Sequence, residues 1–459
     1  MATTLTTSST TAARSPPTEP LVVVLGSTGT GKSDLAVELA SRFDGEIINA
    51  DAMQLYNGLP VLTNKMPSAS RRGIPHHLLG HISPLDPPWN VDVFRHEASR
   101  VVADIRSRGK LPILVGGTHY YLDALLFPDV VLDSLHQQPD DGDNALLLNQ
   151  PTDVLLAELR KCDPVMADRW HPNDRRKILR SLEIYLHTGR PASDLYAEQR
   201  RRVAHNPSQQ PWDKLLFWVH ADRETLCQRL DRRVDSMLHA GLLNEVRELY
   251  TLRRDATRPL NMTKGIWQAI GYRQFEPYLS ALDDASTPTS SLPALQAAAL
   301  EDVKAATRRY AAHQTRWIRC KQTRRLRDQG PDALSSLYLV DSTDPPLFRA
   351  QVLDPAAHLV AQFLRGEPRP LPADLSPRAR EVLTAVGDPP PPEVPRRHIC
   401  DVCQATLLTD EAWRRHVRGV AHRRVVNKKK KLALVSYEAR EKTPPQTDGL
   451  SSPEIASLF

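Results

Sequence analysis

The feature that most constrains this chain is a glycine-rich segment, GSTGTGKS, at residues 26–33. It follows an apolar run, Leu21 to Leu25, and precedes a segment with apolar residues at helical spacing. A strand, a glycine-rich turn and a helix in this order form a cradle whose backbone N–H groups face an anion. In this spacing Lys32 reaches the phosphates and the Ser33 hydroxyl faces Mg²⁺. The predicted di- or triphosphate site consists of Gly26, Ser27, Thr28, Gly29, Thr30, Gly31, Lys32 and Ser33.

Two further repeats of strand and helix follow this phosphate loop. The apolar strand at residues 46–49 leads to Asp51, and the strand at residues 113–115 leads to the turn Gly116-Gly117-Thr118. Strands that alternate with helices predict a parallel sheet covered by helices, an α/β fold. Ligands of such sheets bind at the carboxyl ends of the strands, so we expect Asp51 to lie beside the phosphate loop.

The third strand ends in glycines, where many nucleotide-hydrolysing proteins with a phosphate loop carry an acidic residue that helps to hold Mg²⁺. The carboxylate of Asp51 follows the second strand instead. This difference favours a transferase or a kinase of small molecules over a motor or a switch. The longest uninterrupted apolar runs have about five residues, far fewer than a membrane span needs, so we expect no integral membrane segment.

Basic residues recur in two helical segments further along the chain. Between residues 173 and 189, Arg176, Lys177 and Arg180 lie off an apolar helical stripe. They form either a solvated charged face or a face that contacts nucleic-acid phosphates. Between residues 304 and 321, Lys and Arg alternate with Tyr310 and Trp317. That pattern suits a nucleic-acid surface, although the aromatic residues alone are more typical of a helix packed on a core.

A metal-binding pattern lies near the C-terminus. Cys400, Cys403, His416 and His422 have the spacing C-x2-C-x12-H-x5-H, which is that of a closed structural zinc site. A module of about thirty residues has too small a core to fold without its metal, so we expect Zn²⁺ to be needed for folding. Residues 396–431 contain eleven Lys or Arg and three Asp or Glu, which predicts a polyanionic partner. The long interval between the histidines resembles the fingers of RNA-binding proteins.

Eight motifs follow one another along the chain: GSTGTGKS, DAMQLY, GIPHHLL, LPILVGGTHYY, HPNDRRKILRSLEIY with HTG, RRVDSML, GIWQAIGYRQF and TRRYAAHQTRW. In this combination the chain resembles the eukaryotic tRNA dimethylallyltransferases, or tRNA isopentenyltransferases, over about residues 20–325. The finger is similar to their C-terminal extension. The resemblance implies a phosphate-loop core with a helical insertion that grips the anticodon arm. It also implies transfer of the dimethylallyl group of dimethylallyl diphosphate to N6 of the adenosine directly 3′ of the anticodon.

The resemblance further implies roles for single residues. Asp51 is implied as the general base, Thr118 as a second reaction-site residue and Arg233 as a diphosphate contact. Contacts with tRNA are implied for Asp51, Ala52, Met53 and Gln54, and for Arg176, Lys177, Ile178, Leu179 and Arg180.

The chain departs from the family in two places. Ala52 stands where serine is common, and His119-Tyr120 stand where Gly-Leu is common. We expect the first to remove one hydrogen bond to tRNA and the second to alter the channel wall. His76 and His77 match a family motif, and packed, hydrogen-bonded histidines explain that motif at least as well as a chemical role does.

These features predict the order of the domains. Residues 20–128 and 212–345 form the core, residues 129–211 the tRNA-binding insertion, residues 346–395 a helix and a proline-rich linker, and residues 396–431 the finger with its basic tail. Residues 432–459 are expected to be disordered. Residues 1–19 are either a disordered tail or a weak transit peptide, because they are rich in Ser and Thr and contain no acidic residue before Glu19.

The residues alone also allow a second class of protein. It is an RNA-binding NTPase or small-molecule kinase in which the same loop holds ATP. We expect a monomer whose partners are tRNA and dimethylallyl diphosphate. The N-terminal segment and the run Lys428 to Lys431 make mitochondrial, cytoplasmic and nuclear locations the expected ones.

Overall fold

The computed structural model describes residues 11, 15–127, 147–205, 212–257, 259–385, 396–403, 405–420 and 422–429. Most of the predicted N-terminal tail, the first part of the predicted insertion and the predicted disordered C-terminus lie outside these residues. The chain forms two compact units. The core unit comprises residues 1–136 and 198–389, and the second unit comprises residues 137–197 and 390–459.

The core unit is built on a six-stranded sheet with the order β3-β2-β4-β1-β5-β6, in which every pairing is parallel. This confirms the predicted α/β class. Successive residues of a strand point to opposite faces, so Val23 of β1 packs on one face and Val22 and Val24 pack on the other. The strands are β1 (Pro20–Gly26), β2 (Gly45–Asn49), β3 (His76–His77), β4 (Leu111–Gly116), β5 (Asp213–His220) and β6 (Leu337–Asp341).

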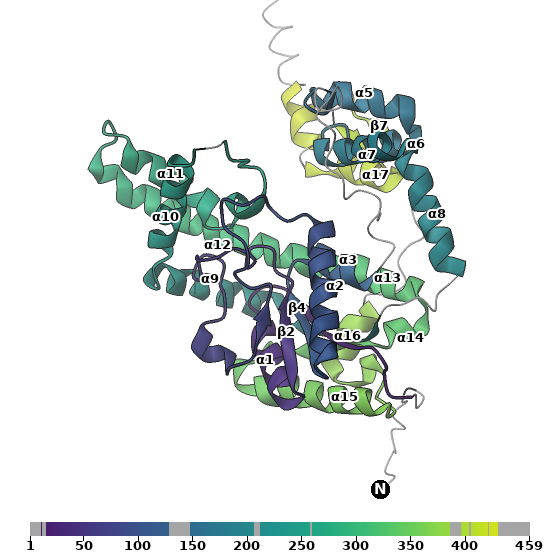
Figure 1. Cartoon of the computed structure of the whole chain (residues 1–459). Coiled ribbons are helices and arrows are strands. Elements are labelled where there is room, and N and C mark those ends of the chain that lie inside the picture. The colour runs from purple at the N-terminus through teal and green to yellow at the C-terminus, as the bar shows by residue number, and fades with distance from the viewer. Residues whose placement is uncertain are drawn as a thin grey trace, which may run out of the picture. The chain divides into compact units, whose positions relative to one another are not determined.

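Helices cover both faces of this sheet, so its strands are buried on either side, as parallel sheets require (Figure 1). Helices α1 (Lys32–Arg42) and α15 (Asp354–Arg365) pack on the face that contains Val22. Helices α2 (Val91–Ser107) and α3 (His119–Leu126) pack on the opposite face. The α2 helix begins after its cap Asn90, whose side chain accepts a hydrogen bond of 2.9 Å from Val93 N.

Further helices extend the core unit beyond the sheet. The longest, α12, contacts both α9 and α11, so that these helices form one packed layer. The helices that follow β5, apart from α15, are α9 (Arg223–His239), α10 (Leu242–Arg254), α11 (Tyr272–Asp283), α12 (Leu292–Trp317), α13 (Thr323–Asp328), α14 (Pro331–Leu334) and α16 (Pro377–Ala385).

The predicted proline-rich linker is wrong up to residue 385, because the segment that ends there packs on the core. Ala379 and Val382 of α16 are buried in the core, and Tyr338 Oη donates a hydrogen bond of 2.8 Å to Pro370 O. A proline at the first position of a helix costs no hydrogen bond, so Pro377 begins α16 and does not prevent it. The remainder of the linker, residues 386–395, lies outside the described residues.

The second unit contains two groups of elements. In the first, α5 (Thr152–Cys162), α6 (Pro164–Arg169) and α7 (Arg175–Thr188) pack on one another, and α8 (Ala192–His205) follows. The α7 helix begins after its cap Asp174 and ends before Gly189, within the helical segment predicted between residues 173 and 189. The second group is the antiparallel pair β7 (His398–Ile399) and β8 (Thr406–Leu407), followed by α17 (Asp410–Arg418).

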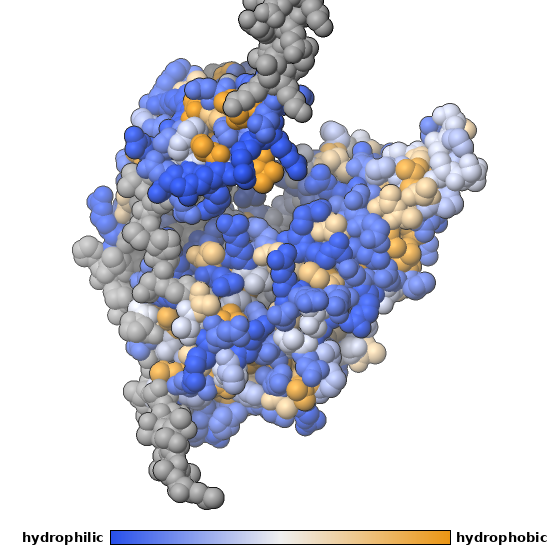
Figure 2. Space-filling model, turned by 180° about the vertical axis from the view of Figure 1, so that it is seen from behind, coloured by the Kyte–Doolittle hydropathy of each residue, from blue (hydrophilic) through white to orange (hydrophobic). Residues whose placement is uncertain are grey.

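The described helices include none with both the length and the apolar composition of a membrane span. Figure 2 shows mostly hydrophilic residues on the visible face, with hydrophobic residues in small groups. Both observations agree with the lack of a long apolar run in the sequence.

Candidate active site

The phosphate loop joins β1 to α1 at the carboxyl edge of the sheet. Gly29 and Gly31 have φ angles of 84° and 86°, a region that glycine adopts without steric cost. A Cβ atom at Gly31 would lie 2.7 Å from Phe348 Cε2, and one at Gly26 would lie 2.4 Å from Val219 O. The tight turn of the loop therefore requires the glycines of the predicted motif.

Two cations contact this loop. Lys32 Nζ donates a hydrogen bond of 2.7 Å to Ser27 O, and Arg233 Nη2 donates one of 3.0 Å to Thr28 Oγ1. Burial lowers the pKa of Lys32 to about 8, while the charge of Asp51 raises it and that of Arg233 lowers it. Burial also lowers the pKa of the Arg233 guanidinium. Desolvated cations beside backbone N–H groups favour a multiply charged anion.

Asp51 lies two residues beyond β2, as predicted, at the same edge of the sheet. Its backbone N–H donates to Asn49 Oδ1 at 3.0 Å, and its Oδ1 accepts from Met53 N at 3.0 Å. Burial raises the pKa of Asp51, and the hydrogen bond from Met53 and the charge of Lys32 oppose this shift. Its other oxygen, Oδ2, lies 3.7 Å from the point where a Cβ atom of Gly117 would be. The hydrogen bond from Met53 N thus holds one oxygen of the Asp51 carboxylate in place.

Thr118 fixes the turn after β4 to the segment after β2. Its Oγ1 accepts a hydrogen bond of 2.9 Å from Ala52 N, and its own N–H donates to Ala50 O at 3.2 Å. A Cβ atom at Gly116 would lie 2.3 Å from Ala50 O, so no acidic side chain fits at the end of β4. This contact explains why the carboxylate of the site comes from the end of the neighbouring strand.

Gln314 of α12 bonds to two of the segments that line the site, and these contacts were not predicted from the sequence. Gln314 is 2% exposed. Its Oε1 accepts from Thr28 N at 2.8 Å, and its Nε2 donates to Gly117 O at 2.8 Å. Tyr310, one turn earlier on the same helix face, donates to Gly117 O at 3.5 Å. The motif TRRYAAHQTRW contains both residues, but their spacing reveals only a shared face and not the partner of that face.

The phosphate loop, Asp51 and Arg233 line one cavity of about 620 Å³. The Ser33 side chain lines it as well, as does Gly117. The structure thereby brings together the residues predicted to hold a diphosphate and the predicted general base. Thr118 is not among the residues that line this cavity, and its Oγ1 accepts a hydrogen bond from Ala52 N.

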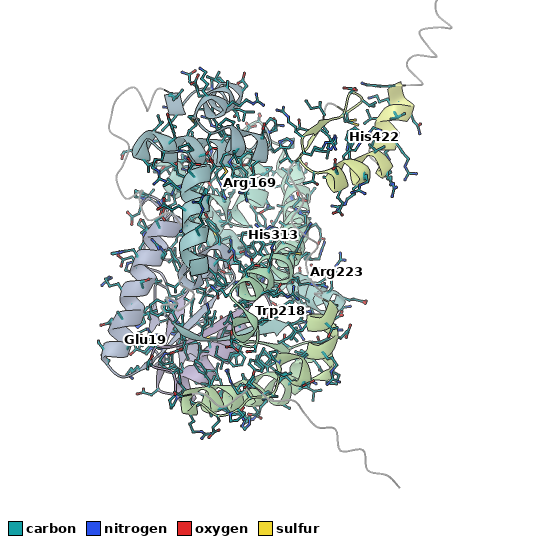
Figure 3. The ribbon with its side chains drawn as sticks, turned by 90° about the vertical axis from the view of Figure 1, so that its right-hand side faces the viewer. Glu19, Arg169, Trp218, Arg223, His313 and His422 are labelled. Atoms are coloured by element: carbon teal, nitrogen blue, oxygen red, sulfur yellow. The ribbon has the colours of Figure 1, made fainter. Side chains whose placement is uncertain are left out.

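Tyr310 and Trp317 of α12 are half-buried and bond to neighbouring segments of the core unit. Trp317 Nε1 donates a hydrogen bond of 2.8 Å to the buried carboxylate of Asp123. The basic residues lie on another face of α12, beside a cavity of about 1090 Å³ between α9, α12 and α16. Figure 3 shows Arg223, at the start of α9, on the outside of the core. This cavity is lined by Arg223, Arg308, Arg309, Arg316, Arg319 and Arg378.

The histidines at positions 76, 77 and 119 are either hydrogen-bonded or buried. His77 Nε2 lies 2.6 Å from Glu46 Oε2, and His76 Nδ1 lies 2.8 Å from Ile74 O, so both histidines are held by hydrogen bonds. His119 is buried, and burial lowers the pKa of its imidazole to about 3, which keeps the ring neutral.

The predicted tRNA contacts fall on two separate surfaces. Met53 and Gln54 are half-buried, and Gln54 Nε2 donates to Thr63 O at 3.2 Å and to Asn64 O at 3.1 Å. In the second unit Arg176 and Lys177 of α7 are exposed, and Leu179 and Arg180 are half-buried. The Ile178 side chain is fully buried and offers no surface to a partner, and the implied tRNA contacts of this segment stay predictions.

The predicted metal ligands come together in the second unit. His422 Nδ1 lies 3.6 Å from Cys400 Sγ, 3.4 Å from Cys403 Sγ and 3.1 Å from His416 Nε2. All four candidate ligand atoms lie within 4.8 Å of one another and are placed to hold a metal ion. Figure 3 shows His422 in this module.

The fold and the cavity define an α/β protein with a phosphate loop, in which the half-buried carboxylate of Asp51 lines the same cavity as the anion cradle. A family model described as IPP transferase matches residues 54–321. The chain belongs to this IPP transferase family.

Relatives named tRNA dimethylallyltransferase match the chain over most of its length. The protein from Schizosaccharomyces pombe is 36% identical over 434 residues, which cover 90% of this chain and 96% of that protein. The protein from Homo sapiens is 33% identical, with 93% of this chain and 91% of that protein covered. A crystal structure described as a eukaryotic dimethylallyltransferase acting on tRNA has a TM-score of 0.76 and 31% identity. The match covers 92% of this chain and 100% of that one.

Proposed function

We propose that this protein transfers the dimethylallyl group of dimethylallyl diphosphate to N6 of the adenosine directly 3′ of the anticodon in tRNA. The observation that carries this proposal is the single cavity shared by Lys32, Arg233 and Asp51. The cations are placed for a diphosphate that leaves, and the carboxylate is placed for a proton that is lost. The names of the relatives support dimethylallyl as the group transferred and tRNA as its acceptor.

The phosphate loop stabilises the leaving group. When the bond between the allylic carbon and the diphosphate oxygen breaks, its electron pair stays on that oxygen. Lys32, Arg233 and the loop N–H groups offset this charge in a partly dry site, where fixed charges act strongly. The Ser33 hydroxyl in the cavity is a hard oxygen ligand that suits Mg²⁺, which binds few protein groups and several substrate oxygens. Bound there, Mg²⁺ would neutralise further diphosphate charge.

Asp51 completes the reaction at the acceptor. The lone pair of an exocyclic amine is delocalised into the purine ring, so N6 is a poor nucleophile. As the bond from N6 to the allylic carbon forms, Asp51 takes the proton that N6 loses. Such general-base help typically contributes about 10² to 10⁴ in rate. The adenine must leave its stack to reach this carboxylate, which lines the same cavity as the phosphate loop.

The arginine-lined cavity of the core unit supports contact with the tRNA backbone. Arg309 and Arg316 of α12, and Arg319 directly after it, are exposed and line the cavity of about 1090 Å³. Guanidinium groups bind phosphates in two-pronged geometry, and such contacts give affinity without reading sequence. In the second unit the exposed Arg176 presents a guanidinium group and Lys177 an ammonium group, and both attract phosphates.

We propose Zn²⁺ as the metal of the Cys-His cluster. Zinc lies about 2.3 Å from sulfur and about 2.0 Å from nitrogen, so a tetrahedral site has sulfur-to-nitrogen edges of about 3.5 Å. The distances of 3.6 Å and 3.4 Å from His422 Nδ1 to the two sulfurs match this value. In the same module, the rings of His398 and Trp413 stack with their centroids 5.3 Å apart.

Loss of the metal should weaken tRNA binding and leave the chemistry of the core in place. For Cys400→Ser we expect an affinity about tenfold lower near physiological salt, because the unfolded finger no longer presents its basic residues together. Cys162→Ser, in the same unit but outside the cluster, is the matched control. Filter binding across a salt series measures the effect, and an unchanged affinity and salt slope for Cys400→Ser would contradict it.

The acceptor is tested with two unmodified tRNA transcripts that differ only at the position 3′ of the anticodon. With radiolabelled dimethylallyl diphosphate, the adenosine transcript should gain label and the guanosine transcript should not, since guanine carries O6 in place of the N6 amine. Equal labelling of both transcripts would contradict the proposed acceptor.

A further inference from the structure

Gln314 joins the two halves of the proposed reaction site. Its carboxamide spans from the N–H of Thr28 in the phosphate loop to the carbonyl of Gly117 after β4, with both hydrogen bonds at 2.8 Å. The orientation of the amide follows from its partners, because Thr28 offers a donor and Gly117 an acceptor. At 2% exposure, Gln314 is shielded from solvent water.

At the donor end, Gln314 determines the shape of the phosphate loop. The Thr28 N–H points to Gln314 Oε1, and Thr28 Oγ1 accepts from Arg233 Nη2 at 3.0 Å. One loop residue is therefore held on both sides, by α12 through its backbone and by α9 through its side chain. A shift of Thr28 would move the loop against Arg233, and so would change where the leaving oxygen meets its positive charge.

At the acceptor end, Gln314 fixes the turn after β4. This turn borders the carboxylate of Asp51, the proposed general base. A Cβ atom at Gly117 would lie 2.4 Å from Gln314 Nε2 and 3.7 Å from Asp51 Oδ2. The position of a Gly117 side chain is thus bordered by both the amide of Gln314 and the carboxylate of Asp51. Tyr310 supports the contact from the preceding turn of α12, since its hydroxyl also donates to Gly117 O.

The geometry therefore points to a further role, and we propose that Gln314 is a positioning residue for the transfer reaction. It holds the diphosphate loop and the carboxylate at the separation that the reaction needs, and it acts through Thr28 and Gly117. This inference rests on the proposed function. A misplacement of reacting groups by about 1 Å typically costs about 10²-fold in rate. Removal of the amide also leaves a buried donor and a buried acceptor without partners.

Gln314→Leu tests the loss of the bridge. We expect kcat to fall about 10²-fold, while KM for each substrate and the affinity for inorganic pyrophosphate stay within about fivefold. Thr307→Val is the matched control, because it removes a hydrogen bond within the same helix, from Thr307 Oγ1 to Val303 O, at a distance from the site. Thr307→Val should keep the wild-type kcat. A loss confined to KM or to pyrophosphate affinity would make Gln314 a binding residue and overturn the proposal.

Gln314→Glu gives a signature that a merely structural role would not produce. A carboxyl group keeps the acceptor for Thr28 N–H, but it bonds to Gly117 O only when protonated. The ratio of its kcat to that of the wild type should therefore rise as pH falls. A ratio that is constant with pH, or a wild-type rate in both variants, would overturn the proposal. If the wild-type protein binds pyrophosphate and tRNA but transfers nothing, the proposed function itself fails, and this inference fails with it.

Discussion

Asp51→Asn should lower the rate of dimethylallyl transfer about 10³-fold and leave the affinity for tRNA within about threefold. Asparagine keeps the size of the side chain, and its Oδ1 can still accept from Met53 N, so the local backbone should persist. What it loses is the ability to take the N6 proton. Single-turnover rates with the enzyme in excess measure the chemical step, and filter binding measures tRNA affinity. Wild-type rates in this variant would remove Asp51 from its assigned role.

The dependence of the transfer rate on pH tests the role of Asp51 independently. A general base must be deprotonated, and burial raises the pKa of Asp51 above its usual value of 3.8. The rate at low substrate should therefore fall as pH drops through that raised pKa, which places the acid limb above pH 3.8. Asp51→Asn should lack this limb. An acid limb retained in the variant would mean that another group titrates.

Lys32→Ala should lower kcat/KM for dimethylallyl diphosphate about 10³-fold and weaken the binding of inorganic pyrophosphate, while tRNA affinity stays within about threefold. The side chain contributes a buried positive charge that touches the loop at Ser27 O. Since its pKa is about 8 in the free protein, the wild-type kcat/KM for the donor should also decline as pH rises through about 8 and this charge is lost.

Lys110→Met is the matched control for this charge. Lys110 precedes β4 at the amino edge of the sheet, away from the cavity, and pairs with Asp44 at 2.7 Å. It should leave donor kinetics within about twofold, as exposed ion pairs contribute little. Equal losses in the two lysine variants would show that the effect is general, and would contradict a diphosphate role for Lys32.

The parts of the site that are local in sequence were predictable from the residues. The phosphate loop follows its strand directly, and Asp51 follows the next strand, so the rule for parallel sheets places both at one edge. The helix caps Asn90, Asp174 and Thr409 were predictable for the same reason, since each bonds to a backbone N–H three residues away. Metal ligands with a fixed spacing in a short module belong to the same category.

Contacts that join distant segments were not predictable in this way. The bond from Thr28 N to Gln314 spans 286 residues, and helical periodicity shows which side chains share a face but not what that face meets. The packing of α16 was missed because proline suggested a linker, whereas the burial of Ala379 depends on tertiary contacts. Ile178 was assigned to tRNA as part of a motif, although its position on the apolar stripe predicted burial.

The proposed function requires the phosphate loop to hold a prenyl donor for transfer to tRNA. The most direct test is mass spectrometry of nucleosides from tRNA that has been incubated with the purified protein and Mg²⁺, with dimethylallyl diphosphate in one tube and ATP in another. We predict that adenosine gains one C5H8 unit in the first tube. No gain there, together with phosphate released from ATP in the second, would contradict the claim and indicate an RNA-binding NTPase.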